Sequence, residues 1–228
     1  MDSDIKRKIN SNLKILPRAT RDAFLFLSEQ KWISENGWYL AGGTALALQT
    51  GHRVSVDLDF FTTQKDFDNN NDVLTNFLGN KNWSPYINKK NTVYGTLYRA
   101  KMSFIAYPFF VPKEKVVEYG FIKILDIKDI AIMKIIAISQ RGTKRDFFDL
   151  YWLVKNVDSL ESFVRKLKIQ YPDIAHNYHH IIAALHYFKD AEQDEDPKIN
   201  FDVSWNEVKK FFKKEVISGL VNKIMDIK

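Results

Sequence analysis

The stretch Leu40-Ala-Gly-Gly-Thr-Ala-Leu-Ala-Leu48 and the stretch Gly51-His-Arg-Val-Ser-Val-Asp-Leu-Asp-Phe-Phe61 decide the fold of this chain. A glycine pair that opens a short helix leaves main-chain N–H groups free to face phosphate oxygens, and the helix dipole adds positive potential there. Asp57 and Asp59 are two positions apart on an expected strand, so both carboxylates lie on one face. Hard oxygen ligands of this kind suit Mg²⁺, or Mn²⁺ as the alternative ion, better than zinc. The two stretches together predict a site for a metal ion and a nucleoside triphosphate.

Each half of this pattern has a second interpretation when it is taken alone. Gly42-Gly43-Thr44 is also typical of a turn that starts a helix capped near Thr44. The two acids are also typical of the exposed face of an edge strand. What favours a phosphate site is the conjunction of a glycine turn, a short helix, Arg53 and Ser55, and two carboxylates that enter an apolar strand.

The hydrophobic pattern places this site in an α+β arrangement. An amphipathic helix over residues 18–35 ends at Asn36-Gly37,. The run that follows predicts a strand at 38–41, a helix at 44–49 and a strand at 55–61 that carries the acids. A helix at 72–78 and further strands are expected at 83–88, 92–98, 100–107 and 121–125,.

The chain becomes helical from Asp126 onward and carries a second group of charged residues. Lys134 lies among apolar residues, and Arg141 returns to the same helix face two turns later. Lys134 is either a lysine that reaches out from a helix flank or a group that binds triphosphate oxygens. Asp146 and Asp149 share one side of the next helix, where they either favour its N-terminus or serve the site. We expect one of them to pair with Lys134 or Arg141 and the other to face the site.

Helical patterns at 160–169, 176–188 and 204–227 predict a C-terminal helical bundle,. We therefore predict two domains, a nucleotide-binding domain over residues 1–155 and a helical bundle over residues 156–228. The acidic stretch at 190–196 is expected to be a solvated loop. His176, His179 and His180 have a spacing that zinc can use, but the sequence provides no evident third ligand.

Composition and charge narrow the class of protein. The chain has 228 residues, 45% of them hydrophobic, and a net charge of +6. Residues 1–155 carry 23 Lys and Arg against 16 Asp and Glu, so the basic excess lies with the glycine and carboxylate motifs. Such an excess attracts RNA, or is ordinary solubilising charge. The absence of cysteine, of an apolar run long enough to span a bilayer and of a signal-peptide pattern predicts a cytoplasmic protein with no membrane partner,.

The block from Gly42 to Asp59 resembles the first motif of the AbiEii/AbiGii toxin family, a branch of the polymerase-β-like nucleotidyltransferases. A second block, Asp129-Ile-Ala-Ile-Met-Lys134 through Arg141 to Asp146-Phe-Phe-Asp149, is similar to the family's lysine and aspartate motifs. The two blocks occur in the right order and span residues 40–153, about half of the chain. Superfamily members usually have a third carboxylate on a neighbouring strand, whereas residues 101–107 hold no acid and Ser103 stands in that strand.

The resemblance implies a nucleotidyltransferase core with a small mixed sheet flanked by helices. It implies a metal-dependent toxin of a toxin–antitoxin or phage-abortive-infection system that transfers NMP from an NTP to RNA, such as the 3′ end of tRNA, with a cognate antitoxin as partner. Asp57 and Asp59 would hold the metal, and the catalytic set would add Lys134, Asp146 and Asp149. The nucleotide-binding set would be Gly42, Gly43, Thr44, Arg53, Ser55, Lys134 and Arg141. The alternatives are nucleotidyl or phosphoryl transfer to a protein hydroxyl, and a non-catalytic module that binds nucleotide or RNA.

Overall fold

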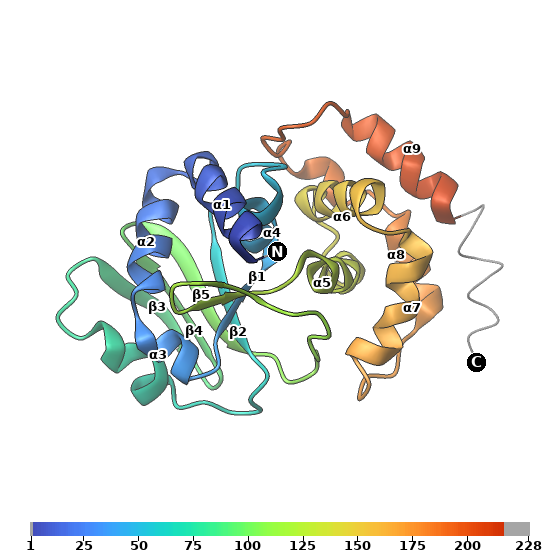
Figure 1. Cartoon of the computed structure of the whole chain (residues 1–228). Coiled ribbons are helices and arrows are strands. Elements are labelled where there is room, and N and C mark those ends of the chain that lie inside the picture. Colours follow the sequence, from blue (N-terminus) through green and yellow to red (C-terminus); the bar gives the residue numbers. More distant parts are fainter. Residues whose placement is uncertain (1, 217–228) are drawn as a thin grey trace. The chain divides into compact units, whose positions relative to one another are not determined.

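The computed structural model describes residues 2–216, which form two compact units divided between Asp126 and Ile127. The first unit is built on a seven-stranded mixed sheet flanked by helices, and the second consists of helices (Figure 1). The predicted α+β fold, a small mixed sheet followed by helices, is therefore confirmed. The part of the helix predicted at 204–227 that spans residues 217–227 lies outside the described residues.

The sheet of the first unit has the strand order β3-β4-β5-β2-β1-β7-β6. β2 pairs antiparallel with β1 and parallel with β5, and β1 pairs parallel with β7. The β3-β4, β4-β5 and β6-β7 pairs are antiparallel. The strands are β1 (Tyr39–Ala41), β2 (Leu58–Thr62), β3 (Trp83–Lys89), β4 (Thr92–Leu97), β5 (Ala100–Ala106), β6 (Val117–Tyr119) and β7 (Ile122–Ile124).

Helices and short turns connect these strands. Helix α4 follows β1 without a loop, because the last residue of β1, Ala41, is also the residue before the first helical residue, Gly42. Asn12 joins α1 to α4, since its amide nitrogen donates to the carbonyl of Leu48 (2.9 Å). The helices are α1 (Asp2–Asn12), α2 (Arg18–Ser28), α3 (Lys31–Glu35) and α4 (Gly42–Thr50), with 3-10 turns at Leu13–Ile15 and Leu74–Phe77 and a π-helical turn at Asn69–Val73.

Aromatic side chains fill the core between α3 and the sheet. Phe60 of β2 and Phe104 of β5 stack with ring centroids 5.2 Å apart. Trp38 and Trp32 approach Phe104 at 5.1 and 5.6 Å. Phe77 lies on Trp83 at 4.2 Å. Burial of large rings supplies much of the hydrophobic stabilisation of this unit, and it assigns Phe60 and Phe104 to the helix-covered face of the sheet.

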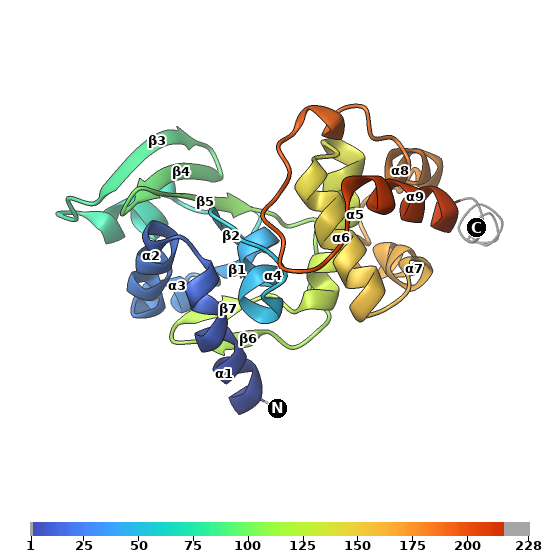
Figure 2. The same ribbon diagram turned by 90° about the horizontal axis from the view of Figure 1, so that it is seen from above.

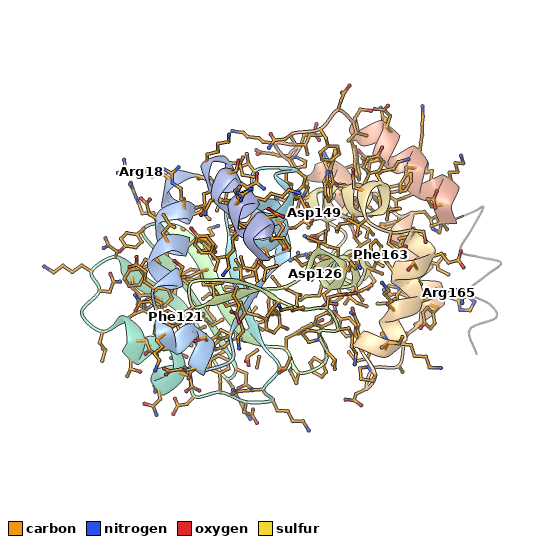
Figure 3. The ribbon with its side chains drawn as sticks, viewed as in Figure 1. Arg18, Phe121, Asp126, Asp149, Phe163 and Arg165 are labelled. Atoms are coloured by element: carbon orange, nitrogen blue, oxygen red, sulfur yellow. The ribbon has the colours of Figure 1, made fainter. Side chains whose placement is uncertain are left out.

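The second unit is a set of helices in which α5 packs against α6, α7 and α8 (Figure 1). Its core includes Phe147, Phe163 and Phe212, all fully buried, and Figure 3 labels Phe163. The helices are α5 (Ile127–Gln140), α6 (Lys144–Asn156), α7 (Leu160–Gln170), α8 (Tyr178–Leu185) and α9 (Trp205–Glu215), with a 3-10 turn at Ala191–Gln193.

The predicted division into domains at residues 1–155 and 156–228 stays a prediction, and the compact units of the structure have another boundary. The compact units divide after Asp126, because α5 and α6 pack on the later helices and share their core. The motif that contains Lys134 therefore belongs to the helical unit. Periodicity alone gives no sign of this, since an amphipathic helix has the same pattern whichever partner covers it.

Some predicted elements differ in detail from those observed. The single helix expected at 18–35 is broken into α2 and α3, and the strand expected at 55–61 begins only at Leu58. The helix expected at 72–78 is a π-helical turn followed by a 3-10 turn, and α1 and β6 were not predicted. Among the described residues, no helix has the length and apolar character needed to cross a membrane.

Candidate functional site

The glycine pair lets the backbone of α4 pass close to two charged side chains. Gly42 has φ = 73°, a left-handed conformation that costs other residues energy,. A Cβ atom at Gly42 would lie 3.1 Å from Asp59 Oδ2, and one at Gly43 would lie 2.2 Å from Arg53 Nη2. No side chain caps the N-terminus of α4. The first turn of α4 thus has no side-chain cap, and a carboxylate and a guanidinium lie beside it.

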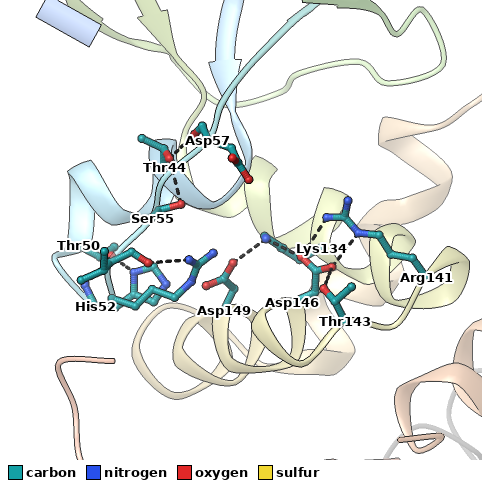
Figure 4. A network of polar contacts seen from close by, with 12 residues as sticks. Thr44, Thr50, His52, Ser55, Asp57, Lys134, Arg141, Thr143, Asp146 and Asp149 are labelled. Atoms are coloured by element: carbon teal, nitrogen blue, oxygen red, sulfur yellow. Dashed lines mark hydrogen bonds and ion pairs between the residues drawn. The ribbon is translucent and has the colours of Figure 1, made fainter. Parts of the chain in front are cut away.

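Side chains from two helices hold the segment that precedes β2 (Figure 4 shows Thr44, Ser55 and Asp57). The Thr44 hydroxyl donates to the main-chain carbonyl of Asp57, and its oxygen lies 3.0 Å from Ser55 Oγ. Thr20 of α2 donates to the carbonyl of Val56 at 2.8 Å. These bonds hold residues 55–57 outside the sheet ladder, which explains why the predicted strand begins three residues late. Asp57 is therefore fixed just before β2.

Asp59 lies inside β2 and is positioned by both neighbouring strands. It is in register with Ala41 of β1 and with Ser103 of β5. The Ser103 hydroxyl donates to Asp59 Oδ1 at 2.8 Å. This bond orients the carboxylate, whose other oxygen faces the glycine turn. Ser103 stands in the neighbouring strand, β5, which holds no acid.

The carboxylates fit a divalent cation that also binds a substrate. The described part of the chain has no cluster of three or more His, Cys, Asp or Glu side chains with metal-binding geometry. Mg²⁺ is usually bound by one or two carboxylates and completes its shell with water and substrate phosphates, whereas structural zinc needs four protein ligands. Two half-buried aspartates beside a helix N-terminus match the first of these arrangements.

Arg53 contributes positive charge to the glycine turn. Its side chain is buried, and Nη1 donates to the carbonyl of Val54 at 2.9 Å. The position of Nη2 beside Gly43 shows that the guanidinium lies against the start of α4. A fixed guanidinium next to unsatisfied helix amides favours an anion with several oxygens, such as a phosphate.

The second unit contains a buried ion network centred on Lys134 (Figure 4). Lys134 Nζ lies 2.7 Å from Asp146 Oδ1 and 2.5 Å from Asp149 Oδ2, and both carboxylates are fully buried. Arg141 Nε and the Thr143 hydroxyl donate to Asp146 Oδ2 at 2.9 and 2.7 Å. The network links the end of α5 to the start of α6. The expected pairing of an aspartate with Lys134 or Arg141 is confirmed at Asp146, which contacts both.

Electrostatics explain why Asp146 remains charged although it is buried. Burial alone opposes the charged form of a carboxylate, but the positive charges of Lys134 and Arg141 outweigh it and hold the pKa of Asp146 far below its ordinary value,. Asp149 also binds Lys134. The sequence predicts that one aspartate faces the site, whereas in the structure both carboxylates contact Lys134. The roles of Lys134, Arg141, Asp146 and Asp149 toward a substrate stay predictions.

The acidic stretch at 190–196 is more than a solvated loop. Asp194 Oδ2 accepts from the main-chain N–H of Lys144 at 2.8 Å, and Asp196 Oδ1 lies 3.0 Å from Lys144 Nζ. The stretch therefore caps the N-terminus of α6 and neutralises a buried lysine. His180 and His176 make hydrogen bonds to main-chain carbonyls, and no group suited to zinc occurs among the described residues.

Sequence reasoning missed the contacts that come from distant parts of the chain. Thr20 holds Val56 from α2, and the Gln170 amide donates to the buried Asp129 carboxylate at 2.5 Å. Neither residue belongs to a motif, so a single sequence carries no signal for them. Ser103 was noticeable only as a polar residue in an apolar strand beside the expected acids.

Comparisons with known proteins agree with this geometry. A model of the family described as "Nucleotidyl transferase AbiEii toxin, Type IV TA system" matches residues 26–218. An uncharacterized protein of Aquifex aeolicus (strain VF5) is 38% identical over 195 residues, which cover 82% of this chain and 90% of that protein.

Two solved structures share the fold. A proposed nucleotidyltransferase from H. pylori has a TM-score of 0.52 at 18% identity, with 92% of this chain and 98% of that chain covered. MenT4, a nucleotidyltransferase toxin from Mycobacterium tuberculosis H37Rv, has a TM-score of 0.51 at 13% identity, with 99% and 92% covered. Because the family model spans most of the chain, this protein belongs to the AbiEii nucleotidyltransferase toxin family, as its two sequence motifs had indicated.

Proposed function

We propose that this protein transfers NMP from an NTP to a hydroxyl group of RNA, such as the 3′ end of tRNA. The observation that carries the proposal is the position of Asp59, which is oriented by Ser103 and faces the glycine turn at the start of α4. This arrangement brings a candidate metal ligand next to a candidate phosphate site within one unit. Membership of the family supports the same reaction class.

Asp57 and Asp59 would hold Mg²⁺, or Mn²⁺ as the alternative. The ion would supply charge stabilisation at the phosphates of the bound NTP. Thr44 acts on this pair through the backbone, since its hydroxyl holds the carbonyl of Asp57. Ser103 acts through its bond to Asp59. Both are positioning residues.

The triphosphate would lie over the first turn of α4, at Gly42, Gly43 and Thr44, with Arg53 as its cation. Ser55 supports this turn through its contact with Thr44. In the reaction, the acceptor hydroxyl oxygen forms a bond to the α-phosphorus as the bond from that phosphorus to the bridging β-phosphate oxygen breaks. Pyrophosphate leaves, and the hydroxyl proton passes to solvent. Positioning and charge stabilisation carry most of the catalysis in phosphate transfers of this kind.

We further infer that Lys134 and Arg141 serve the triphosphate and that Asp146 and Asp149 position them. The proposal for the two aspartates is supported by their contacts with Lys134 and by the hydrogen bonds of Asp146 to Arg141. Two buried carboxylates compensate the charge of the Lys134 ammonium, so Arg141, whose side chain is half exposed, is the better candidate for binding an anion,.

A cognate antitoxin is the partner that a type IV toxin–antitoxin family implies, and we place the protein in the cytoplasm with its NTP and RNA substrates. The competing proposal is transfer to a protein hydroxyl, which would use the same carboxylates and glycine turn. A third is a binding module without turnover, which the absence of a carboxylate at Ser103 favours.

The acceptor is tested by incubating the protein with total tRNA, Mg²⁺ and each of the four α-³²P-labelled NTPs, followed by one denaturing gel that separates RNA from protein. We expect label in RNA. Excess EDTA should abolish this label and added Mg²⁺ should restore it, because the two carboxylates and the triphosphate are all negatively charged and need the ion between them. Label confined to polypeptide would shift the proposal to a protein acceptor. Labelled RNA that persists in EDTA would contradict the metal assignment.

Gly42→Ala is expected to lower turnover more strongly than stability. The substitution forces a left-handed residue, at a cost of about 1–2 kcal/mol, and puts a methyl group 3.1 Å from Asp59 Oδ2,. The matched control is Gly37→Ala, because Gly37 has φ = 70° and its added Cβ would meet side-chain atoms only at 3.8 Å. Thermal unfolding and initial rates should show similar destabilisation of both variants and a loss of rate only in Gly42→Ala. Equal rates would remove Gly42 from the site.

A further inference from the structure

The strand register defines a row of paired residues that runs from Asp59 across the sheet to the edge strand β3. Asp59 of β2 is paired with Ser103 of β5, Ser103 with Tyr94 of β4, and Tyr94 with Ile87 of β3. Directly paired residues point to the same face of a sheet. Because neighbouring strands lie about 4.8 Å apart, Tyr94 is about 10 Å from Asp59 along this row, the length of about three stacked bases.

The opposite face of these strands is used by the hydrophobic core. Val93 and Leu97 of β4 are fully buried, as is Phe104 of β5, which approaches the ring of Trp32 on α3. Figure 2 shows α2 and α3 on one side of β3, β4 and β5. Since side chains alternate along a strand, Tyr94 lies on the other face, the one that carries Asp59.

Two tyrosines form an aromatic pair on this face. A register shift between Pro85 and Ile87 leaves Tyr86 outside the regular ladder. Its ring lies 6.2 Å from that of Tyr94, and 55% of Tyr86 is exposed. Tyr86 thus lies on an edge strand and outside the buried core.

The strands of this region carry positive charge in sequence, and Asp66 of the preceding loop pairs with one of these charges, Lys90, at 3.4 Å. Residues 73–113 contain six Lys and Arg and no Asp or Glu. Lys101 is in register with Thr96 and Lys89 with Thr92, so both lysines share the face of Tyr94. Both are exposed, and within the described part of the chain neither is placed in an ion pair. The face defined by Tyr86, Tyr94, Lys89 and Lys101, here called the tyrosine face, therefore combines an exposed ring and a half-buried ring with two exposed lysines.

We propose that the tyrosine face binds the single-stranded end of the RNA acceptor and leads its terminal hydroxyl toward Asp59. Exposed rings stack on bases of any sequence, and lysines beside them bind the phosphates, which is the chemistry of single-strand binding surfaces. The absence of carboxylates from residues 73–113 argues against a basic protein segment as the occupant. The inference rests on the proposed function, since it names the surface through which the RNA substrate reaches the same carboxylates.

The test measures binding of a short fluorescein-labelled single-stranded ribo-oligonucleotide to the full chain by anisotropy, without NTP or metal ion. Tyr86→Ser is expected to weaken binding by at least about fivefold, whereas Tyr86→Phe, which keeps the ring, should bind as the wild type does. Lys101→Ala and Lys89→Ala should each lower the slope of log affinity against log salt by about 0.7. Tyr187→Ser and Lys168→Ala replace exposed residues of the second unit and serve as matched controls.

Wild-type affinity in Tyr86→Ser, or equal losses in Tyr187→Ser and Lys168→Ala, would overturn the inference, as would failure of the wild type to bind the oligonucleotide. The assay involves no turnover, so its failure is distinct from failure of the proposed function. RNA that binds through the tyrosine face but never acquires label from an NTP would contradict the proposed function alone.

Discussion

Replacing Asp59 with asparagine is expected to lower the turnover number for nucleotidyl transfer by about a thousandfold or more, the scale lost when a preorganised charge-stabilising group is removed. Asparagine has the same shape and keeps an oxygen that can accept from Ser103, so the strand contacts of β2 are retained. What is lost is the negative charge. Initial rates at saturating NTP and Mg²⁺, with thermal unfolding of the same preparation, measure the two effects separately.

Asp173→Asn is the matched control, because Asp173 is exposed in the second unit and belongs to neither motif. Its rate should equal that of the wild type. If Asp59→Asn retained more than about a tenth of the wild-type rate, Asp59 would be neither a metal ligand nor a stabiliser of the reacting phosphates.

Lys134→Met is expected to lower the free energy of unfolding by about 3–5 kcal/mol. Methionine keeps the length of the side chain but leaves Asp146 and Asp149 buried near each other without the ammonium that joins them. In a chain of this size the midpoint of thermal unfolding should fall by about 10 °C. Lys168→Met, at an exposed site on α7, should change stability by no more than about 0.5 kcal/mol.

The double variant Lys134→Met with Asp149→Asn tests the cause of this loss. Removing the negative charge of Asp149 should recover part of the stability, because only one of the two carboxylates that faced the ammonium then stays charged, and Arg141 still pairs with that one, Asp146,. If Lys134→Met alone unfolded at the same temperature as the wild type, the network would not be what stabilises the packing of α5 on α6. Loss of activity in Lys134 variants has to be interpreted at temperatures where the protein remains folded.

The local motifs of the first unit were predictable because each depends on neighbours in sequence. A glycine pair after an apolar strand predicts the start of α4, and the spacing of Asp57 and Asp59 places both carboxylates beside it. The exact start of β2 was not predictable. It depends on Thr20 and Thr44, which hold Val56 and Asp57 outside the ladder from two different helices.

In the second unit the helices were predictable, but the partners of their charged side chains were not. Helical periodicity identified α5 and α6, but the partners of Lys134 follow from the packing of one helix on another. The same holds for the acidic stretch, whose Asp194 and Asp196 look solvated in sequence and bind Lys144 in the structure. The tyrosine face was likewise hidden, since only the strand register puts Tyr94 in the row of Asp59.

The most direct test of the central claim compares two labels in one reaction. The protein, tRNA and Mg²⁺ are incubated in parallel with α-³²P-labelled and γ-³²P-labelled samples of the same NTP, and radioactivity in RNA and in protein is counted. Nucleotidyl transfer to RNA predicts label in RNA from the α position and none from the γ position, with labelled pyrophosphate released from the latter. Label from the γ position in RNA or protein would show phosphoryl transfer instead and would contradict the account.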